Sequence, residues 1–453
     1  MTVRWWCELA WLGGPDATPG VVLEAGADGR FAAVTPGVAR ADADDATVLA
    51  GLTLPGLVNA HSHAFHRALR GRAAEGMASF WRWRNQMYEL AERLDPDTYR
   101  DLAAATFAEM ALAGITTVGE FHYLHHQPDG RPYPGGGDPM SEAIVDAAAT
   151  AGVRLTLLDT CYLTGGIGQA VDGVQRRFSD GDVDAWAARA GRISCSATVR
   201  VGAAIHSVRA VPPAEMVVVA GWAHDREAPL HAHVSEQPAE NDACIATYRT
   251  TPTRLLAEVG ALESRFTAVH ATHVERADID LLGSARASVC VCPTTERDLA
   301  DGIGPAGDLR DAGVSICVGS DSHAVIDLFE EGRGVELDER LTSRSRGRHR
   351  AAELLGAVTA GGGRALGWGD GGVLAADALA DFCTIAVDGV RLAGTIGPDG
   401  RGAAAAAIFA AGAADVSDVV VAGRPVVADG RHLGVGDVGA ALSRSIDRLG
   451  LER

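Results

Sequence analysis

The sequence predicts an α/β fold in which a (β/α)8 barrel carries a small β-sandwich domain built from both ends of the chain. In the middle of the 453 residues, short apolar runs alternate with helical patterns, as in repeated strand–helix units. Both ends hold short strand-like runs separated by Gly, Pro and Asp. The length also suits a barrel of about 250 residues with a smaller second domain.

The β domain is expected to comprise residues 1–53 and 369–453. Its strand-like runs lie at 4–12, 20–24, 30–34 and 47–54, and then at 380–387, 416–421 and 425–427. The last two runs indicate a hairpin with Gly423 near the turn, because glycine adopts turn conformations most easily. The barrel, predicted over residues 54–368, therefore interrupts this domain.

Eight apolar runs are candidate barrel strands: 54–60, 115–121, 154–158, 198–205, 230–234, 267–270, 288–292 and 315–319. Helical patterns lie between or after them, for example at 96–113, 140–151, 252–259 and 350–360. Active sites of parallel barrels lie at the carboxyl ends of the strands. Polar residues at those ends are therefore the test of the prediction.

Histidines and carboxylates follow four of these strands. His61 and His63 end the first strand, and side chains two residues apart in a strand point the same way. Taken alone, this pair could equally be two metal ligands or two surface histidines that follow a strand. Later strands add His233 and Glu236, then His270, and then Asp321. Three imidazoles and one carboxylate meeting at one barrel mouth suit zinc or a similar divalent ion.

Other residues compete for these positions. His231 shares a strand face with His233, and we favour His233 because it is nearer the strand end and precedes Glu236. His273 and His323 are interpreted as loop residues or as residues that support the site. Cys290 and Cys292 resemble a metal pair, but the apolar run around them favours packing.

Composition excludes several classes of function. Forty basic and 59 acidic residues give a net charge of −19, which argues against nucleic acid or an anionic membrane as a partner. The chain contains no lysine, which excludes Schiff-base chemistry and a P-loop. Eight cysteines without a CxxC pair, and an N-terminus without a signal-peptide layout, predict a cytoplasmic protein with reduced thiols.

The sequence resembles the amidohydrolase superfamily, specifically its deaminase branch with one metal ion. The resemblance covers nearly the whole chain and rests on His61-x-His63, His233 with Glu236, His270 and Asp321. It implies that one divalent ion, Zn²⁺ or alternatively Fe²⁺ or Mn²⁺, is bound by His61, His63, His233 and Asp321. The missing lysine agrees, since the two-metal branches generally use a carboxylated lysine.

The resemblance also implies a mechanism. Asp321 would accept a proton from the attacking water, and His270 would orient the hydroxide or stabilise the tetrahedral centre. Glu236 would carry a proton to the departing nitrogen. The expected reaction is attack on a C=N carbon with loss of ammonia.

Further motifs resemble the deiminases of N-formimino-L-glutamate, enzymes of histidine degradation. They are His61-Ser62-His63-Ala64-Phe65, Trp83-Arg84-x-x-Met87-Tyr88, Phe121-His122-Tyr123-Leu124-His125, His206-Ser207-x-Arg209 and Cys292-Pro293-Thr294-Thr295-Glu296. The resemblance implies that His206 and Arg209 hold the α-carboxylate of a small carboxylate-bearing substrate, and that Arg84 and Tyr123 contact the rest. The product would be N-formyl-L-glutamate.

Some choices stay open at this point. His66 stands where these deiminases are expected to have glutamine, which allows an altered substrate preference, although histidine also donates and accepts hydrogen bonds. Arg82 competes with Arg84, and His122 competes with Tyr123. One alternative function is deamination of a base or nucleoside, and another is hydrolysis of an amide or of a carbon–chlorine bond. A third is a metal-binding scaffold without catalysis, which the presence of both Glu236 and His270 disfavours. A homodimer is expected because twofold pairs are the commonest assembly.

Overall fold

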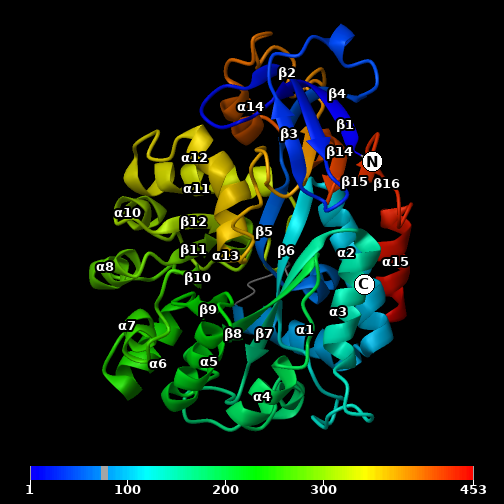
Figure 1. Ribbon diagram of the computed structural model, residues 1–453. Helices are drawn as coiled ribbons and strands as arrows, with labels where there is room; N and C mark the ends of the chain where they lie inside the picture. The colour runs from blue at the N-terminus through cyan, green and yellow to red at the C-terminus, as the bar shows by residue number, and fades with distance from the viewer. Residues whose placement is uncertain (1, 73–79, 452–453) are drawn as a thin grey trace.

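The computed structural model describes residues 2–72 and 80–451 and confirms a barrel with a mixed sheet from both termini (Figure 1). Eight parallel strands form the barrel in the order β12-β11-β10-β9-β8-β7-β6-β5. They are β5 (Leu57–Ser62), β6 (Ile115–His122), β7 (Arg154–Cys161), β8 (Val199–Ile205), β9 (Leu230–Val234), β10 (Phe266–His270), β11 (Ser288–Val291) and β12 (Ser315–Val318).

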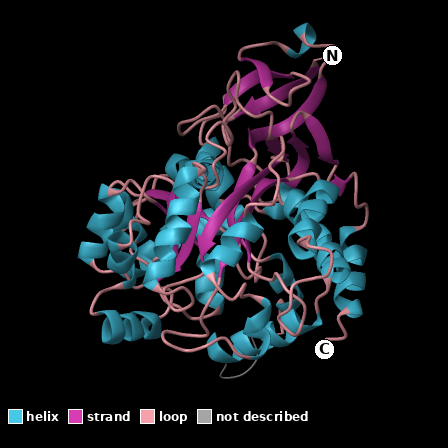
Figure 2. Cartoon of the chain, turned by 60° about the horizontal axis from the view of Figure 1, so that its bottom comes forward, coloured by secondary structure: helices cyan, strands magenta, loops and turns pink. Residues whose placement is uncertain are grey.

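Most of the helices surround these strands, as Figure 2 shows. The helices are α1 (Phe80–Arg93), α2 (Pro96–Leu112), α3 (Pro139–Ala151), α4 (Val183–Ala190), α5 (Pro213–Asp225), α6 (Pro238–Tyr248), α7 (Pro252–Glu258), α8 (Arg276–Ser284), α9 (Pro293–Asp298), α10 (Ala306–Asp311), α11 (Leu328–Ser343), α12 (Ala351–Gly356), α13 (Gly362–Ala365), α14 (Ala403–Phe409) and α15 (Val438–Arg448). Six begin with proline at the first position, where its fixed φ and missing N–H suit the first turn. None of the helices in the described ranges is long and apolar enough to cross a membrane.

The first strand begins later than predicted. Leu54 and Pro55 belong to β4 (Thr47–Pro55) of the terminal sheet, and the barrel strand starts at Leu57. Gly56 separates the two strands, and its N–H donates to the carbonyl of Asp381 at 2.9 Å. A Cβ atom at position 56 would lie 2.1 Å from Oγ1 of Thr116, so only glycine fits this junction.

The terminal segments form one mixed sheet in the order β16-β15-β14-β13-β4-β1-β2-β3. Its other strands are β1 (Val3–Ala10), β2 (Thr18–Ala25), β3 (Phe31–Thr35), β13 (Phe382–Ile385), β14 (Val416–Val421), β15 (Arg424–Ala428) and β16 (Arg431–His432). A hydrophobic cluster packs within this domain, and in it the ring of Phe382 lies 5.1 Å from that of Trp5 and 6.2 Å from that of Phe31. The hairpin of β14 and β15, with Gly423 at φ +70°, is confirmed. The domain boundaries stay predictions.

A buried charge network supports the barrel rim beside β6 and β7. Arg189 on α4 contacts Asp138 at 2.9 Å, Asp159 at 2.7 Å and Asp180 at 2.8 Å. Asp138 also caps α3, and His126 lies 3.0 Å from Asp180. Burial opposes the ionisation of Asp138, but the Arg189 guanidinium outweighs it and lowers the pKa of this carboxyl to about 2. One guanidinium therefore fixes three segments of the rim.

We expect Arg189→Met to destabilise the protein, and more at pH 7 than at pH 4. In the native protein the depressed pKa of Asp138 contributes stability that is lost only as the pH falls from 3.8 towards 2, so this contribution is present at both pH 4 and pH 7. Without Arg189, burial dominates and raises the pKa of the carboxyl groups, so their ionisation costs more stability at pH 7 than at pH 4. Breaking such a buried pair costs about 3–5 kcal/mol. Thermal unfolding at both pH values measures the effect.

The control is Arg176→Met. Its guanidinium pairs with Asp172 at 3.0 Å on the exposed surface, so little change in the unfolding temperature is expected. An equal loss of stability at pH 4 and pH 7 in Arg189→Met would contradict the role given to the carboxylates.

Candidate active site

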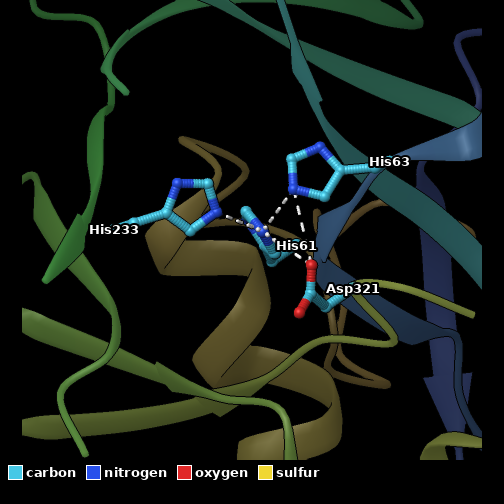
Figure 3. A group of neighbouring side chains, drawn as sticks. All are labelled: His61, His63, His233 and Asp321. Atoms are coloured by element: carbon cyan, nitrogen blue, oxygen red, sulfur yellow. Dashed lines mark hydrogen bonds and ion pairs between the residues drawn. The ribbon is translucent and has the colours of Figure 1, made fainter. Parts of the chain in front are cut away.

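Four buried donor atoms meet at the carboxyl ends of the barrel strands (Figure 3). Nε2 of His61 lies 3.2 Å from Nε2 of His63 and 3.2 Å from Nε2 of His233. Oδ1 of Asp321 lies 3.3 Å from His61 and 3.4 Å from His63. The structure thus brings together the four residues that the sequence analysis assigned to a metal ion.

Backbone carbonyls orient two of these imidazoles. Nδ1 of His63 donates to the carbonyl of Phe121 at 3.0 Å, and Nδ1 of His233 donates to that of His206 at 2.9 Å. Each Nε2 therefore carries a lone pair, as in a metal-binding histidine. Burial lowers the pKa of both histidines well below 6.5, which keeps both rings neutral.

The donor set fits a zinc-type ion. Ligands at tetrahedral corners with bonds of about 2.0–2.1 Å lie roughly 3.3 Å from one another, close to the separations observed among His61, His63, His233 and Asp321. Lone pairs and a carboxylate at such separations repel one another unless a cation lies between them. Imidazole nitrogen with carboxylate oxygen is a donor set for borderline divalent ions.

The backbone is strained where these residues leave their strands. Asp321 has φ +41°, His270 +69° and Ser235 +52°, a region that L-residues seldom adopt. Hydrogen bonds hold these turns: N–H of Asp321 donates to the carbonyl of His61 at 3.1 Å, and N–H of Ser235 donates to Glu240 at 2.9 Å. Strain of this kind is typical of functional sites.

His323 supports the candidate metal site through hydrogen bonds to residues beside the ligands, one of the two roles that the sequence analysis gave it. Its Nδ1 lies 3.0 Å from Oγ of Ser320 and its Nε2 lies 3.2 Å from Oγ of Ser62. Asn59 bonds both the hydroxyl and the N–H of Ser320, at 2.7 and 2.9 Å. These contacts join β5 to the segment after β12 at the seam of the barrel.

Glu236 and His270 stand beside the metal ligands. Nε2 of His270 lies 3.8 Å from Oε1 of Glu236 and 3.8 Å from Oδ2 of Asp321, while its Nδ1 lies 3.3 Å from Glu296. Burial raises the pKa of Glu236 above 4.5. Burial lowers the pKa of His270, but Glu236, Glu296 and Asp321 outweigh it and raise this pKa well above 6.5. The two groups are placed to hold and transfer protons.

The five residues predicted to contact substrate line one pocket with Glu236 and His270. They are Arg84, Tyr123, His206, Arg209 and His66. Aromatic side chains complete the wall: Trp83, Tyr88, Tyr162 and Phe178. The pocket therefore combines cationic and hydrogen-bonding groups with apolar surface.

Arg209 is held firmly in this wall. Its Nε donates to Glu240 at 2.7 Å, and the second oxygen of Glu240 accepts the N–H of Ser235. His206 accepts Nδ1–H of His233 at its carbonyl and presents its ring to the pocket, 4.7 Å from the ring of Tyr162. One chain of contacts thus links the cationic wall to the metal ligands.

His66 pairs with the predicted substrate contact Tyr123. Nε2 of His66 and the Tyr123 hydroxyl are 2.9 Å apart, and the ring of His66 lies 4.6 Å from that of His63. Burial lowers the pKa of His66 to about 3, so the ring is neutral. A neutral imidazole can replace an amide as a hydrogen-bonding group.

The other histidines lie elsewhere. His231 bonds the carbonyl of Ala365 at 2.9 Å, His273 that of Asp301 at 2.8 Å, and His122 contacts the hydroxyl of Tyr99 at 3.3 Å. The side chain of Arg82 lies outside the described residues.

Sequence analysis missed three residues of the site: Tyr162, Gln175 and Glu240. Gln175 donates to the hydroxyls of Tyr88 and Tyr162, both at 3.1 Å. Only the proximity of Tyr162 to the end of β7 could have indicated one of them.

The comparisons with known proteins agree with this geometry. The model of the Amidohydrolase family matches residues 52–426. The chain belongs to the amidohydrolase family. It is 39% identical over 430 residues to the formimidoylglutamate deiminase of Pseudomonas aeruginosa, covering 91% of this chain and 92% of that protein. An 8-oxoguanine deaminase of the same species is 30% identical over 444 residues, or 95% and 94% of the two chains.

Solved structures share the fold. The crystal structure of an amidohydrolase from Brucella melitensis superposes with a TM-score of 0.88 at 31% identity and covers 99% of this chain and all of that one. An adenosine deaminase from Xanthomonas campestris with bound zinc has a TM-score of 0.83 at 24% identity, covering 98% and 97%. The family match, the 39% identity to a formimidoylglutamate deiminase and the four buried candidate ligands together assign the chain to metal-dependent deaminases of the amidohydrolase type.

We expect His233→Ala to lose the bound ion, because it removes one of four converging donors. Mass spectrometric metal analysis should find about one ion per chain in the native protein and a small fraction of this in the variant. His231→Gln is the control, because His231 bonds a carbonyl instead of the cluster. If the control lost its metal ion and His233→Ala kept it, His231 and not His233 would be the metal ligand on β9.

Proposed function

We propose that this amidohydrolase converts N-formimino-L-glutamate and water to N-formyl-L-glutamate and ammonia, a reaction of histidine degradation. One observation carries the proposal: two arginines and a histidine, Arg84, Arg209 and His206, line the same pocket as Glu236 and His270. A dicarboxylate substrate needs such a local cationic wall in a chain of net charge −19. The 39% identity to a formimidoylglutamate deiminase supports it.

The residues then have distinct tasks. Arg209, oriented by Glu240, and His206 bind the α-carboxylate, while Arg84 and Tyr123 contact the remainder. His61, His63, His233 and Asp321 would hold a zinc-type ion, which when bound would supply a water whose pKa is lowered to about 7. Asp321 accepts a proton from the attacking water, and His270 donates a hydrogen bond to the tetrahedral centre. Glu236 delivers a proton to the leaving nitrogen.

A base or nucleoside deaminase is the second candidate. Trp83, Tyr88, Tyr162 and Phe178 offer surfaces on which a base could stack. The 30% identity to an 8-oxoguanine deaminase supports this alternative. Two arginines in the wall favour the dicarboxylate, because a neutral base provides no charge for them to bind.

Ammonia release distinguishes the two candidates. The zinc-loaded protein should release ammonia from N-formimino-L-glutamate and should be much slower on 8-oxoguanine, adenosine and 5-methylthioadenosine. A metal chelator should stop the reaction, and added zinc should restore it. Turnover of a base or nucleoside without turnover of N-formimino-L-glutamate would refute the proposal.

The role of Arg209 has its own comparison. Arg209→Met should lower kcat/KM for N-formimino-L-glutamate roughly 10- to 100-fold, mainly through KM, because a charge-assisted hydrogen bond contributes about 1.5–3 kcal/mol. Arg226→Met is the matched control, since its guanidinium stacks on Trp222 outside the pocket, 4.3 Å from the ring centroid. Equal losses in both variants would show that Arg209 does not bind substrate.

Glu236→Gln tests catalysis against a metal-binding scaffold. The variant should keep its ion, because Glu236 is not among the four clustered donors. Its kcat should fall by about 10²- to 10⁴-fold, the usual contribution of general acid–base catalysis. Metal content and ammonia release are measured on the same sample, and an unchanged kcat would remove Glu236 from the mechanism.

A further inference from the structure

We propose that a second cation site, formed by His270, Cys292 and Asp321, lies at the wall of the pocket, where it takes a thiophilic divalent ion and stops turnover. One donor atom from each residue lies within 4.8 Å of the other two, and all three residues are buried. The inhibition rests on the proposed deaminase function, whereas binding of the ion does not. Cadmium, or zinc beyond the first equivalent, has the required chemistry.

Asp321 can serve both sites because its two oxygens face different groups. Oδ1 lies 3.3 Å from His61 and 3.4 Å from His63, whereas Oδ2 lies 3.8 Å from Nε2 of His270. Figure 3 shows the second oxygen directed away from the imidazoles. A carboxylate used in this way bridges two ions, which lie about 3.5–4 Å apart in two-metal sites.

Glu296 positions the other two ligands. Its Oε1 accepts the N–H of Cys292 at 2.9 Å and lies 3.3 Å from Nδ1 of His270. With Nδ1 bonded, His270 presents Nε2 to the pocket, as metal-binding histidines do. The Cys292 thiol makes weak contacts with Cys290, one of 4.0 Å to its carbonyl and one with its thiol, so a metal–sulfur bond would replace little hydrogen-bond energy.

The spacing around His270 matches a shared ion. Its Nε2 lies 3.8 Å from both Oδ2 of Asp321 and Oε1 of Glu236, too far for hydrogen bonds. Ligands of one tetrahedral ion lie roughly 3.3–3.8 Å apart for bonds of 2.0–2.3 Å. Glu236 thus offers a fourth donor. Nitrogen, sulfur and oxygen together select a soft or borderline ion over magnesium or calcium.

Occupation of this site would remove the proton-transfer groups from catalysis. The ion would bind Nε2 of His270 and the thiolate of Cys292, and the protons that these two groups carry would be released to solvent on binding. His270 and Glu236 could then no longer exchange protons with substrate. The result would be loss of turnover with the first ion still in place.

Cadmium titration tests the proposal with a signal independent of activity. Cadmium–thiolate bonds absorb in the ultraviolet, and the cluster of His61, His63, His233 and Asp321 contains no sulfur. Zinc-loaded Cys195→Ser is the starting protein, because Cys195 is exposed while the other seven cysteines are buried. It should gain the thiolate absorption with about one equivalent of cadmium and lose ammonia release in parallel.

The double variant Cys195→Ser/Cys292→Ser should show no thiolate absorption with cadmium. Its cadmium concentration for half-inhibition should rise at least about tenfold, when each rate is divided by the rate of the same protein without cadmium. Cys317→Ser, which alters a neighbouring buried thiol, should keep both effects. Absorption that persists without Cys292, or inhibition without absorption in the starting protein, would refute the site. If no substrate is turned over, the absorption still tests binding, and only the proposed function fails.

Discussion

The structure depends on the convergence of four donors that would repel one another without a cation. His61 lies in the first barrel strand and His63 directly follows it, His233 lies in the fifth strand, and Asp321 lies in the segment after the eighth. The same residues close the barrel, because Asp321 and His61 also bond through their backbones. The same residues therefore serve both the closure of the barrel and the candidate metal site.

Several groups of the pocket contact this cluster directly or through one neighbour. Nδ1 of His233 binds the carbonyl of His206, whose ring faces the substrate pocket. Asp321 approaches His270, which lies against Glu236 and Glu296. Because each group contacts the next, small shifts in the metal ligands would move the proton-transfer and binding groups together. The left-handed backbone at Asp321 and His270 stores strain that these contacts offset.

Much of the fold could be predicted from the sequence, because strand-length apolar runs and proline- or glycine-marked boundaries are local signals. The convergence of His61, His63, His233 and Asp321 could be predicted because the carboxyl ends of parallel barrel strands face one mouth, whereas their assignment to a metal ion came from the resemblance to a family. The break at Gly56 could not, since it depends on the side chain of Thr116. Nor could the position of Cys292 beside His270 and Asp321, because its apolar neighbours favour a purely packed thiol. Arg209 was found from its strand end, but the Glu240 that orients it lies on a helix.

The most direct test of this account is a crystal structure of the zinc-loaded protein with anomalous data at the zinc edge. The account predicts one strong peak within about 2.0–2.2 Å of Nε2 of His61, His63 and His233 and of one oxygen of Asp321. A fully active protein with no peak at this position, or with the ion bound by other residues, would contradict it.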